Sequence, residues 1–132
     1  MKTRSQLTRR RIVTAVSACL LSLPAAAQLD WLNAAQEFSP RVMEEKVYAD
    51  FAFTNLGEYA VTIQNVKTSC GCTTAKLSKK LYEPGEGGVI QTTFTIGDRT
   101  GTQNKRITVT TDDPKKSNRS LQLKIRIPNV VT

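Results

Sequence analysis

Histidine is absent from the 132-residue chain. Without an imidazole there is no Ser-His-Asp triad, no Cys-His pair and no histidine ligand for a metal ion. Most hydrolase mechanisms and most metal-dependent redox mechanisms are therefore excluded or disfavoured. The sequence offers no catalytic residue and no cofactor-binding residue, and we do not expect an enzyme.

Acidic residues are absent from the first 27 positions, where Lys2, Arg4 and residues 9–11 carry positive charge. An apolar run follows over residues 12–23 and is too short to span a bilayer. It leads into the small residues 25–27. This order is typical of a secretory signal peptide that is cleaved before Gln28. We therefore expect an exported protein, either periplasmic or secreted.

Two variants of this leader stay open. Residues 8–13 contain three consecutive arginines and resemble a twin-arginine signal, which would export a folded protein. Residues 16–19 resemble a lipobox, which would place a lipid on Cys19 and anchor the protein to a membrane. Against lipidation, the residues after Cys19 stay apolar up to the cleavage site. A membrane is therefore expected as a partner only if Cys19 is lipidated.

Excess positive charge is also scarce once the leader is set aside. The full chain has 19 Lys and Arg against 11 Asp and Glu, a net charge of +8. The leader holds five of the basic residues, which leaves 14 basic against 11 acidic side chains, or +3. A nucleic-acid partner is therefore not expected. We interpret the basic residues within 76–80 and 115–119 as solvated faces, and Asp112 and Asp113 as turn and surface residues.

No helical periodicity of two turns or more follows the leader. Short segments alternate between apolar and polar residues instead, as in residues 47–54, 89–96 and 121–127. Turn signals about every ten residues predict a single antiparallel Ig-like β-sandwich of six to eight strands. We expect a signal peptide at 1–27, a lead-in with an edge strand at 28–46, the sandwich at 47–128 and a tail at 129–132.

Local sequence marks the turns and one irregularity. Asn55 and Gly57 are predicted to close the first turn, with Gly57 suited to positive φ. Pro84 and Gly85 fit a type II turn, in which Gly85 takes the position that requires positive φ. Gly101 ends the next turn. Val66 falls out of phase with the strand before it, which predicts a β-bulge just upstream of it.

Cysteine is scarce too, and only Cys70 and Cys72 follow the leader. In an extended strand, residues i and i+2 lie about 6.6 Å apart at Cα, near the upper limit for a disulfide. A Cys70–Cys72 bridge therefore needs a bend, which Gly71 permits. Cysteines of an exported chain favour a structural or labile disulfide. Two alternatives stay open: the two thiolates hold Cu(I), or both side chains pack as small apolar groups.

Four motifs together carry a resemblance to a known family. They are Phe51-x-Phe53-x-Asn55-x-Gly57, Ser69-Cys70-Gly71-Cys72-Thr73, Pro84-Gly85-Glu86-x-Gly88, and Gly101 ahead of the strand at 106–111. Over residues 47–127 the chain resembles a family of exported bacterial immunoglobulin-like domains of unknown function. That family is similar in architecture to the major-sperm-protein and cilia-associated sandwich domains. The resemblance implies a fold and a compartment but no activity.

The sequence thus predicts a small exported binding or structural module of the cell envelope, with protein partners and no cofactor. The alternative is an accessory thiol-redox or Cu(I)-handling protein that uses Cys70 and Cys72. The family often carries a spacer and further domains, whereas here we expect one domain. No oligomeric state is predicted.

Overall fold

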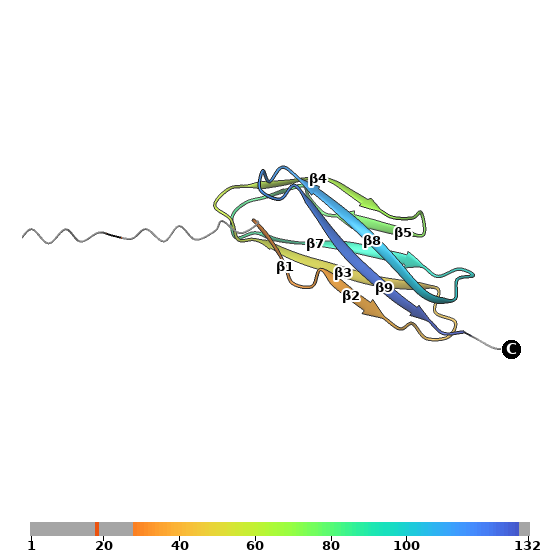
Figure 1. Ribbon diagram of the computed structural model, residues 1–132. Helices are drawn as coiled ribbons and strands as arrows, with labels where there is room; N and C mark the ends of the chain where they lie inside the picture. The colour runs from red at the N-terminus through yellow and green to blue at the C-terminus, as the bar shows by residue number, and fades with distance from the viewer. Residues whose placement is uncertain (1–17, 19–27, 130–132) are drawn as a thin grey trace, which may run out of the picture.

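Two facing β-sheets form the part of the chain that the structure describes (Figure 1). The computed structural model describes Ala18 and residues 28–129. Apart from Ala18, the predicted leader lies outside the described residues, and so do its cleavage and the lipidation of Cys19. Within the described part of the chain, no helix is long and apolar enough to cross a membrane.

Within the described residues, nine strands form the sandwich. The four-stranded sheet has the order β1 (Leu29–Trp31), β3 (Lys46–Asn55), β7 (Gly87–Thr95), β5 (Thr73–Leu77). The five-stranded sheet has the order β2 (Ala35–Phe38), β9 (Asn118–Ile127), β8 (Gly101–Thr111), β4 (Val61–Thr68), β6 (Leu81–Tyr82). The predicted all-β sandwich is confirmed. Its strand number exceeds the expectation because β5, β6 and a second lead-in strand also pair.

The lead-in segment crosses from one sheet to the other. β1 pairs with β3 antiparallel, whereas β2 pairs with β9 in parallel. At the crossing, Leu32 N donates to Ala52 O (3.1 Å), and Gln122 N donates to Ala34 O (2.8 Å). Residues 28–46 therefore supply one edge strand to each sheet and close that side of the sandwich.

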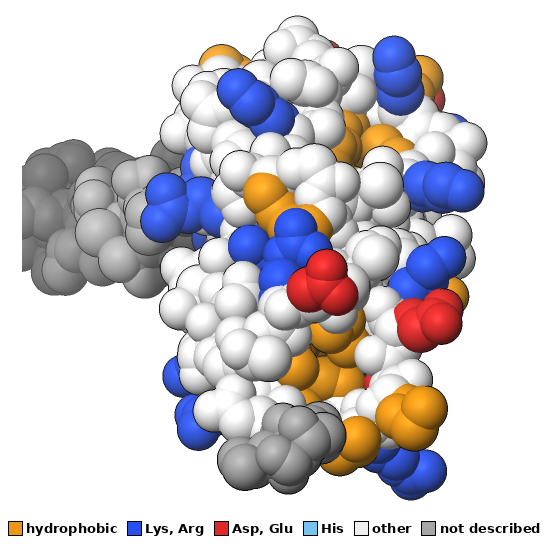
Figure 2. All heavy atoms as spheres, turned by 90° about the vertical axis from the view of Figure 1, so that its right-hand side faces the viewer, with side chains coloured by type: hydrophobic (Ala, Val, Ile, Leu, Met, Phe, Trp, Pro, Cys, Tyr) orange, Lys and Arg blue, Asp and Glu red, His pale blue; other side chains and the backbone are white. Residues whose placement is uncertain are grey.

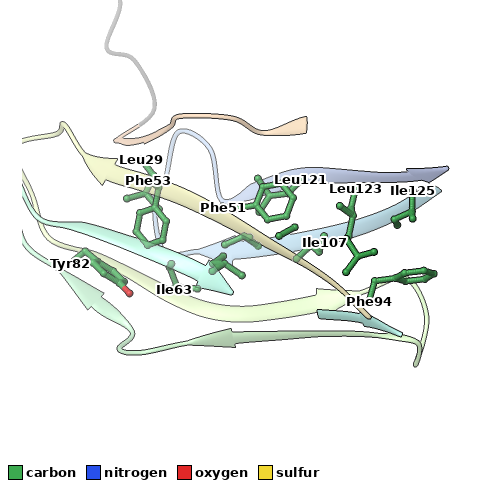
Figure 3. Close-up of a cluster of buried hydrophobic side chains, with 14 of the residues drawn as sticks. Leu29, Phe51, Phe53, Ile63, Tyr82, Phe94, Ile107, Leu121, Leu123 and Ile125 are labelled. Atoms are coloured by element: carbon green, nitrogen blue, oxygen red, sulfur yellow. The ribbon is translucent and has the colours of Figure 1, made fainter. Parts of the chain in front are cut away.

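The two sheets enclose a single core, which Figure 3 shows in close-up. Side chains that alternate inward along the strands meet there, as the period of two requires. The residues predicted to share this interior are at most 3 % exposed: Phe51, Phe53, Ile90, Phe94, Leu123 and Ile125. Full burial of such a side chain is worth about 1.5–3 kcal/mol. The core prediction is confirmed.

The predicted β-bulge is confirmed as well. The register of β4 against β8 shifts between Ile63 and Asn65. After the shift, Val66 pairs with Val109 and packs partly buried against the core. The extra residue returns the apolar side chain to the inner face.

Two short strands follow the Cys-Gly-Cys turn. Residues 73–77 form β5, in which Thr73, Ala75 and Leu77 face inward. Small and polar side chains hide that alternation in the sequence. Tyr82, two residues before Pro84, lies in β6 and is fully buried, with its ring 4.8 Å from that of Phe53 in an edge-to-face arrangement.

The sandwich has two distinct ends. One carries the loops 39–45, 69–72 and 96–100 with residues 127–128, and we call it the loop end. It lies on the right of Figure 1 and faces the viewer in Figure 2. The opposite end carries the turns after β3, β6 and β8. The Cys-Gly-Cys turn belongs to the loop end.

Candidate functional site: the Cys70–Cys72 turn and the loop end

The Cys-Gly-Cys turn connects the two sheets. β4 ends at Thr68 in the five-stranded sheet, and β5 begins at Thr73 in the four-stranded sheet. Residues 69–72 therefore cross from one layer to the other at the margin of the loop end.

The sulfur atoms of Cys70 and Cys72 lie at disulfide distance, and the two Cα atoms are 5.4 Å apart. An extended chain would hold those Cα atoms about 6.6 Å apart, so the turn contains the bend that the sequence required. Gly71 contributes differently from the expectation. Its φ is not positive, and a Cβ on it would meet nothing within 4 Å. Neither backbone strain nor crowding demands glycine there.

Hydrogen bonds hold the turn from within. Thr68 Oγ1 donates to Cys70 O (3.1 Å), and Thr73 N donates to the same oxygen (3.3 Å). The hydroxyl of Thr73 lies 3.8 Å from both sulfur atoms, and Thr73 is 2 % exposed. Thr73 was part of the family motif, but no contact with the cysteines was predicted for it. Its buried hydroxyl lies under the cysteine pair.

Two further contacts tie the turn to neighbouring strands. Ser69 N donates to Arg106 O (2.9 Å), and Arg106 N donates to Ser69 Oγ (3.1 Å). On the other sheet, Thr95 N donates to Cys72 O (2.9 Å). The turn is therefore anchored to β8 on one side and to β7 on the other.

The cysteine pair is accessible enough for exchange chemistry. Cys70 and Cys72 are half-buried, and Gly71 between them is exposed. A small thiol can reach such a site, and attack by its thiolate would open the bridge. The described residues contain no group of three or more His, Cys, Asp and Glu placed to hold a metal ion. Copper(I) bound by the reduced pair would have two sulfur ligands from these cysteines.

The loop end also gathers exposed apolar side chains. Val42 is 56 % exposed and Met43 is 95 % exposed. Met43 has a φ of 71°, a conformation that a residue with a side chain rarely adopts. Both residues line a hollow of about 260 Å³, whose walls include Ile96, Ile127 and Pro128. Figure 2 shows hydrophobic side chains gathered around a depression at this end, with charged side chains around them.

The hollow and the cysteine turn are connected through the end of β7. Ile96 N donates to Glu45 O (2.9 Å), and the backbone N of the preceding Thr95 donates to Cys72 O. One short segment therefore holds the loop 41–45 on one side and the Cys-Gly-Cys turn on the other.

A larger hollow than the one at the loop end lies elsewhere and has a more polar lining. It measures about 510 Å³ on the five-stranded sheet, next to Ser69. Most of its lining side chains are polar or charged, among them Asn104, Arg106, Gln122 and Lys124. Glu37 at its margin forms ion pairs with Lys124 and Arg126. Nothing there matches the apolar side chains of the loop end.

Motif residues at the end of β3 and in the Pro-Gly turn meet at the opposite end, around Asn55. The Asn55 side chain is fully buried, donates to Tyr59 O (2.8 Å) and Tyr82 O (3.0 Å), and accepts from Gly57 N (3.0 Å). Gly85 N donates to Asn55 O (2.7 Å). The predicted turn residue is thus a buried linker between three segments.

The motif glycines act through different causes, and Gly101 among them lies at the loop end. Gly85 has a φ of 83°, as the type II turn after Pro84 requires, and Gly101 has a φ of 73°. Gly57 lacks the expected positive φ, but a Cβ on it would lie 2.6 Å from the Gln28 side chain. A Cβ on Gly88 would lie 2.5 Å from the Tyr82 ring. Close approach explains those two glycines.

One surface assignment needs correction. Asp113 is 4 % exposed, and its carboxylate accepts hydrogen bonds from Gln28 N (3.2 Å) and Lys115 N (2.9 Å). Its neighbour Asp112 is exposed, as expected, and accepts from Thr62 N (2.8 Å). Two adjacent aspartates look alike in a sequence, so no signal distinguished the buried one.

A family model described as "Protein of unknown function (DUF1573)" matches residues 29–127, which include the cysteine turn and the Asn55 cluster. The chain belongs to the DUF1573 family. No curated protein matches the sequence.

Solved structures share the fold of this DUF1573 protein at low identity. A protein of unknown function from Porphyromonas gingivalis W83 matches with a TM-score of 0.68 and 16 % identity, over 82 % of this chain and 51 % of that one. The chain thus spans about half the length of that protein. The PapD-like domain 7 of human CEP192 matches with a TM-score of 0.62 and 12 % identity, over 96 % and 100 %. The E. coli chaperone DraB matches with a TM-score of 0.54 and 14 % identity, over 80 % and 58 %. At these identities the likeness establishes an Ig-like, PapD-like sandwich and nothing further.

Proposed function

We propose that this protein is an exported binding module of the cell envelope that engages a protein partner through its loop end. The basic leader followed by an apolar run and small residues supports export. In this proposal the rest of the sandwich positions the loops and performs no chemistry.

The observation that carries the proposal is the exposure of Met43 beside an apolar hollow. A methionine that is 95 % exposed contributes almost no buried apolar area to the stability of the free protein, and its backbone conformation is unfavourable. Flexible methionine side chains suit binding surfaces because they adapt to the groups they meet. Apolar side chains rimmed by charged ones are the usual composition of a protein interface.

The cysteine turn has a supporting role in this proposal. Its bridge limits the conformations of residues 69–72. The hydrogen bond from Thr95 N to Cys72 O fixes the end of β7, and Ile96 N in turn holds the loop 41–45 through Glu45 O. A preordered loop loses less entropy when it binds. The disulfide then acts as a structural bridge that raises affinity.

The test is the loss of partner binding on a charge substitution at the hollow. Met43→Asp should weaken capture of an envelope partner about tenfold or more, because a carboxylate would be desolvated in an apolar contact. Tyr59→Asp is the matched control, since Tyr59 is an exposed apolar residue, 72 % exposed, at the opposite end. Equal binding by both variants and the unaltered protein would reject the proposal.

A second candidate function rests on the accessible cysteine pair. An accessory thiol-redox or Cu(I)-handling protein would use Cys70 and Cys72 as a reversible dithiol, and their half-burial permits this. Replacement of both cysteines by serine separates the two functions. A binding module keeps its partner with some loss of stability, whereas a redox or copper protein loses its activity.

A further inference from the structure

Asp113 is the one buried carboxylate among the described residues, and its surroundings lack a charged partner. It lies in the loop between β8 and β9, 4 % exposed. Within the described residues, no lysine or arginine nitrogen comes within ion-pair distance of its carboxylate. Lys116 and Arg119 line the same small hollow without pairing with it. A buried carboxylate is costly unless a positive charge compensates it.

The backbone nitrogen of Gln28 occupies the position where that charge is needed. Gln28 N lies 3.2 Å from Asp113 Oδ2. Gln28 O accepts from Leu56 N (2.8 Å), and the Gln28 side chain packs closely on Gly57. Residue 28 is therefore held through its nitrogen, its carbonyl and its side chain. The contact bridges the two sheets at the end opposite the loop end.

The predicted leader ends one residue before this nitrogen. While a peptide bond joins residues 27 and 28, Gln28 N is a neutral amide that can donate one hydrogen bond. Cleavage converts the same atom into an α-ammonium with a full positive charge, and a charge-assisted bond is about twice as strong as a neutral one.

We propose that Asp113 forms the docking site for the chain's own new N-terminus. Processing before Gln28 turns a hydrogen bond into a buried ion pair that staples the first strand to the β8–β9 loop. The protein therefore reaches its full stability only after the leader is removed. The inference rests on cleavage before Gln28 and is independent of the partner proposed for the loop end.

The experiment measures one sample before and after its N-terminus is released. A specific protease recognition sequence is placed in the full chain directly ahead of Gln28, so that cutting leaves Gln28 as the first residue. At pH 6.5 the cut should raise Tm by about 5 °C, within the range expected when a 100-residue domain gains one ion pair. Intact mass must show open-chain glutamine, because a lactam lighter by one ammonia carries no charge.

The Asp113→Asn variant tests whether the carboxylate charge causes the gain in Tm, since the amide keeps the shape and loses the charge. In this variant the cut should change Tm by less than about 1 °C. Asp30→Asn is the matched control, because Asp30 is an exposed aspartate on β1, and it should keep the full gain. If Asp113→Asn does not fold, acetylation of the cut protein's N-terminus removes the same charge and should remove the same gain.

A pH series separates an ion pair from a mere steric effect of cutting. An α-ammonium that gains a carboxylate has a folded pKa above its ordinary value of about 7.7–8.0. The gain is therefore fully present below that ordinary pKa and is lost as pH rises through the folded pKa. Lys116→Gln and Arg119→Gln test the other cations that line the hollow, and the gain should survive both.

Several outcomes would overturn the proposal. They are an equal gain in Asp113→Asn, a gain that persists at high pH, a gain abolished by Arg119→Gln or Lys116→Gln, or a lactam at residue 28 with the gain intact. Partner binding plays no part in these measurements, so their failure would leave the loop-end proposal unaffected.

Discussion

Replacing Asn55 by alanine should destabilise the protein far more than its position beside a turn suggests. The side chain is 0 % exposed and makes three hydrogen bonds, which join the end of β3, the following turn and β6. Alanine removes all three bonds and leaves the Tyr82 carbonyl without this donor in a buried position.

The magnitude follows from those bonds. Each intramolecular hydrogen bond contributes about 0.5–1.5 kcal/mol, and a buried group left unsatisfied adds about 1–3 kcal/mol. Asn55→Ala should therefore lower the free energy of unfolding by at least about 2.5 kcal/mol, a large share of the usual 5–15 kcal/mol. Urea unfolding followed by tryptophan fluorescence is a suitable assay, because Trp31 packs on Phe53 with ring centroids 4.8 Å apart.

Two further variants show whether the hydrogen bonds are the cause. Asn104→Ala removes an exposed asparagine and should change the free energy of unfolding by less than about 0.5 kcal/mol. Asn55→Asp keeps the size but places a carboxyl oxygen against the carbonyl oxygens of Tyr59 and Tyr82. It should be destabilised at pH 7 and recover partly in acid, where a protonated carboxyl can donate. A loss below about 1 kcal/mol for Asn55→Ala would refute the reasoning.

Three further predictions concern packing, the bridge and one ion pair. Gly88→Ala should cost about 2–3 kcal/mol in urea unfolding, because its Cβ would lie 2.5 Å from the ring of Tyr82; an unchanged midpoint would contradict the close approach. Serine at both Cys70 and Cys72 should cost only about 1.5 kcal/mol, since the bridged loop is very short; complete unfolding would show a larger role. The pKa of the Glu86 carboxyl is lowered chiefly by its hydrogen bond from Lys79, so the pair's stabilisation is present above the ordinary glutamate pKa and is lost as pH falls through the lowered one. In Lys79→Met, carboxyl NMR should show the pKa of Glu86 rise toward its ordinary value, and no change would contradict the assignment.

Alternation and turn chemistry made most of the sandwich predictable from sequence. Phe51 and Phe53 in β3 and Leu123 in β9 follow a period of two with apolar residues on one face, so the inner face is visible in the sequence. Val66 breaks the alternation of its strand, and this break predicts the bulge that returns its side chain to the core. A glycine directly after a proline is typical of a type II turn, so the Pro84-Gly85 pair predicts the positive φ of Gly85.

Residues whose roles depend on distant partners were not predictable. Tyr82 stands two residues before a Pro-Gly turn, and nothing local shows that it packs on Phe53. Asp113 is buried because Gln28, 85 residues away in the sequence, lies against it. Thr73 gains its place under the cysteines from the fold of the turn. Sequence patterns report local geometry, whereas these roles arise from long-range contacts.

The candidate site likewise contains residues that the sequence identified and residues that it did not. Cys70 and Cys72 were identified from their spacing and from export, and the structure places them at disulfide distance. Met43 carried no signal, because an exposed methionine in a loop is conspicuous only once its φ and its apolar neighbours are known.

Site-specific photo-cross-linking in intact cells tests the central claim of a partner-binding loop end most directly. A photoreactive amino acid replaces Met43 in one strain and Tyr59 in another, so that both ends carry an exposed probe. We predict one discrete cross-linked envelope protein from position 43 and none from position 59. Cross-links of equal yield from both positions, or none from position 43, would contradict the account.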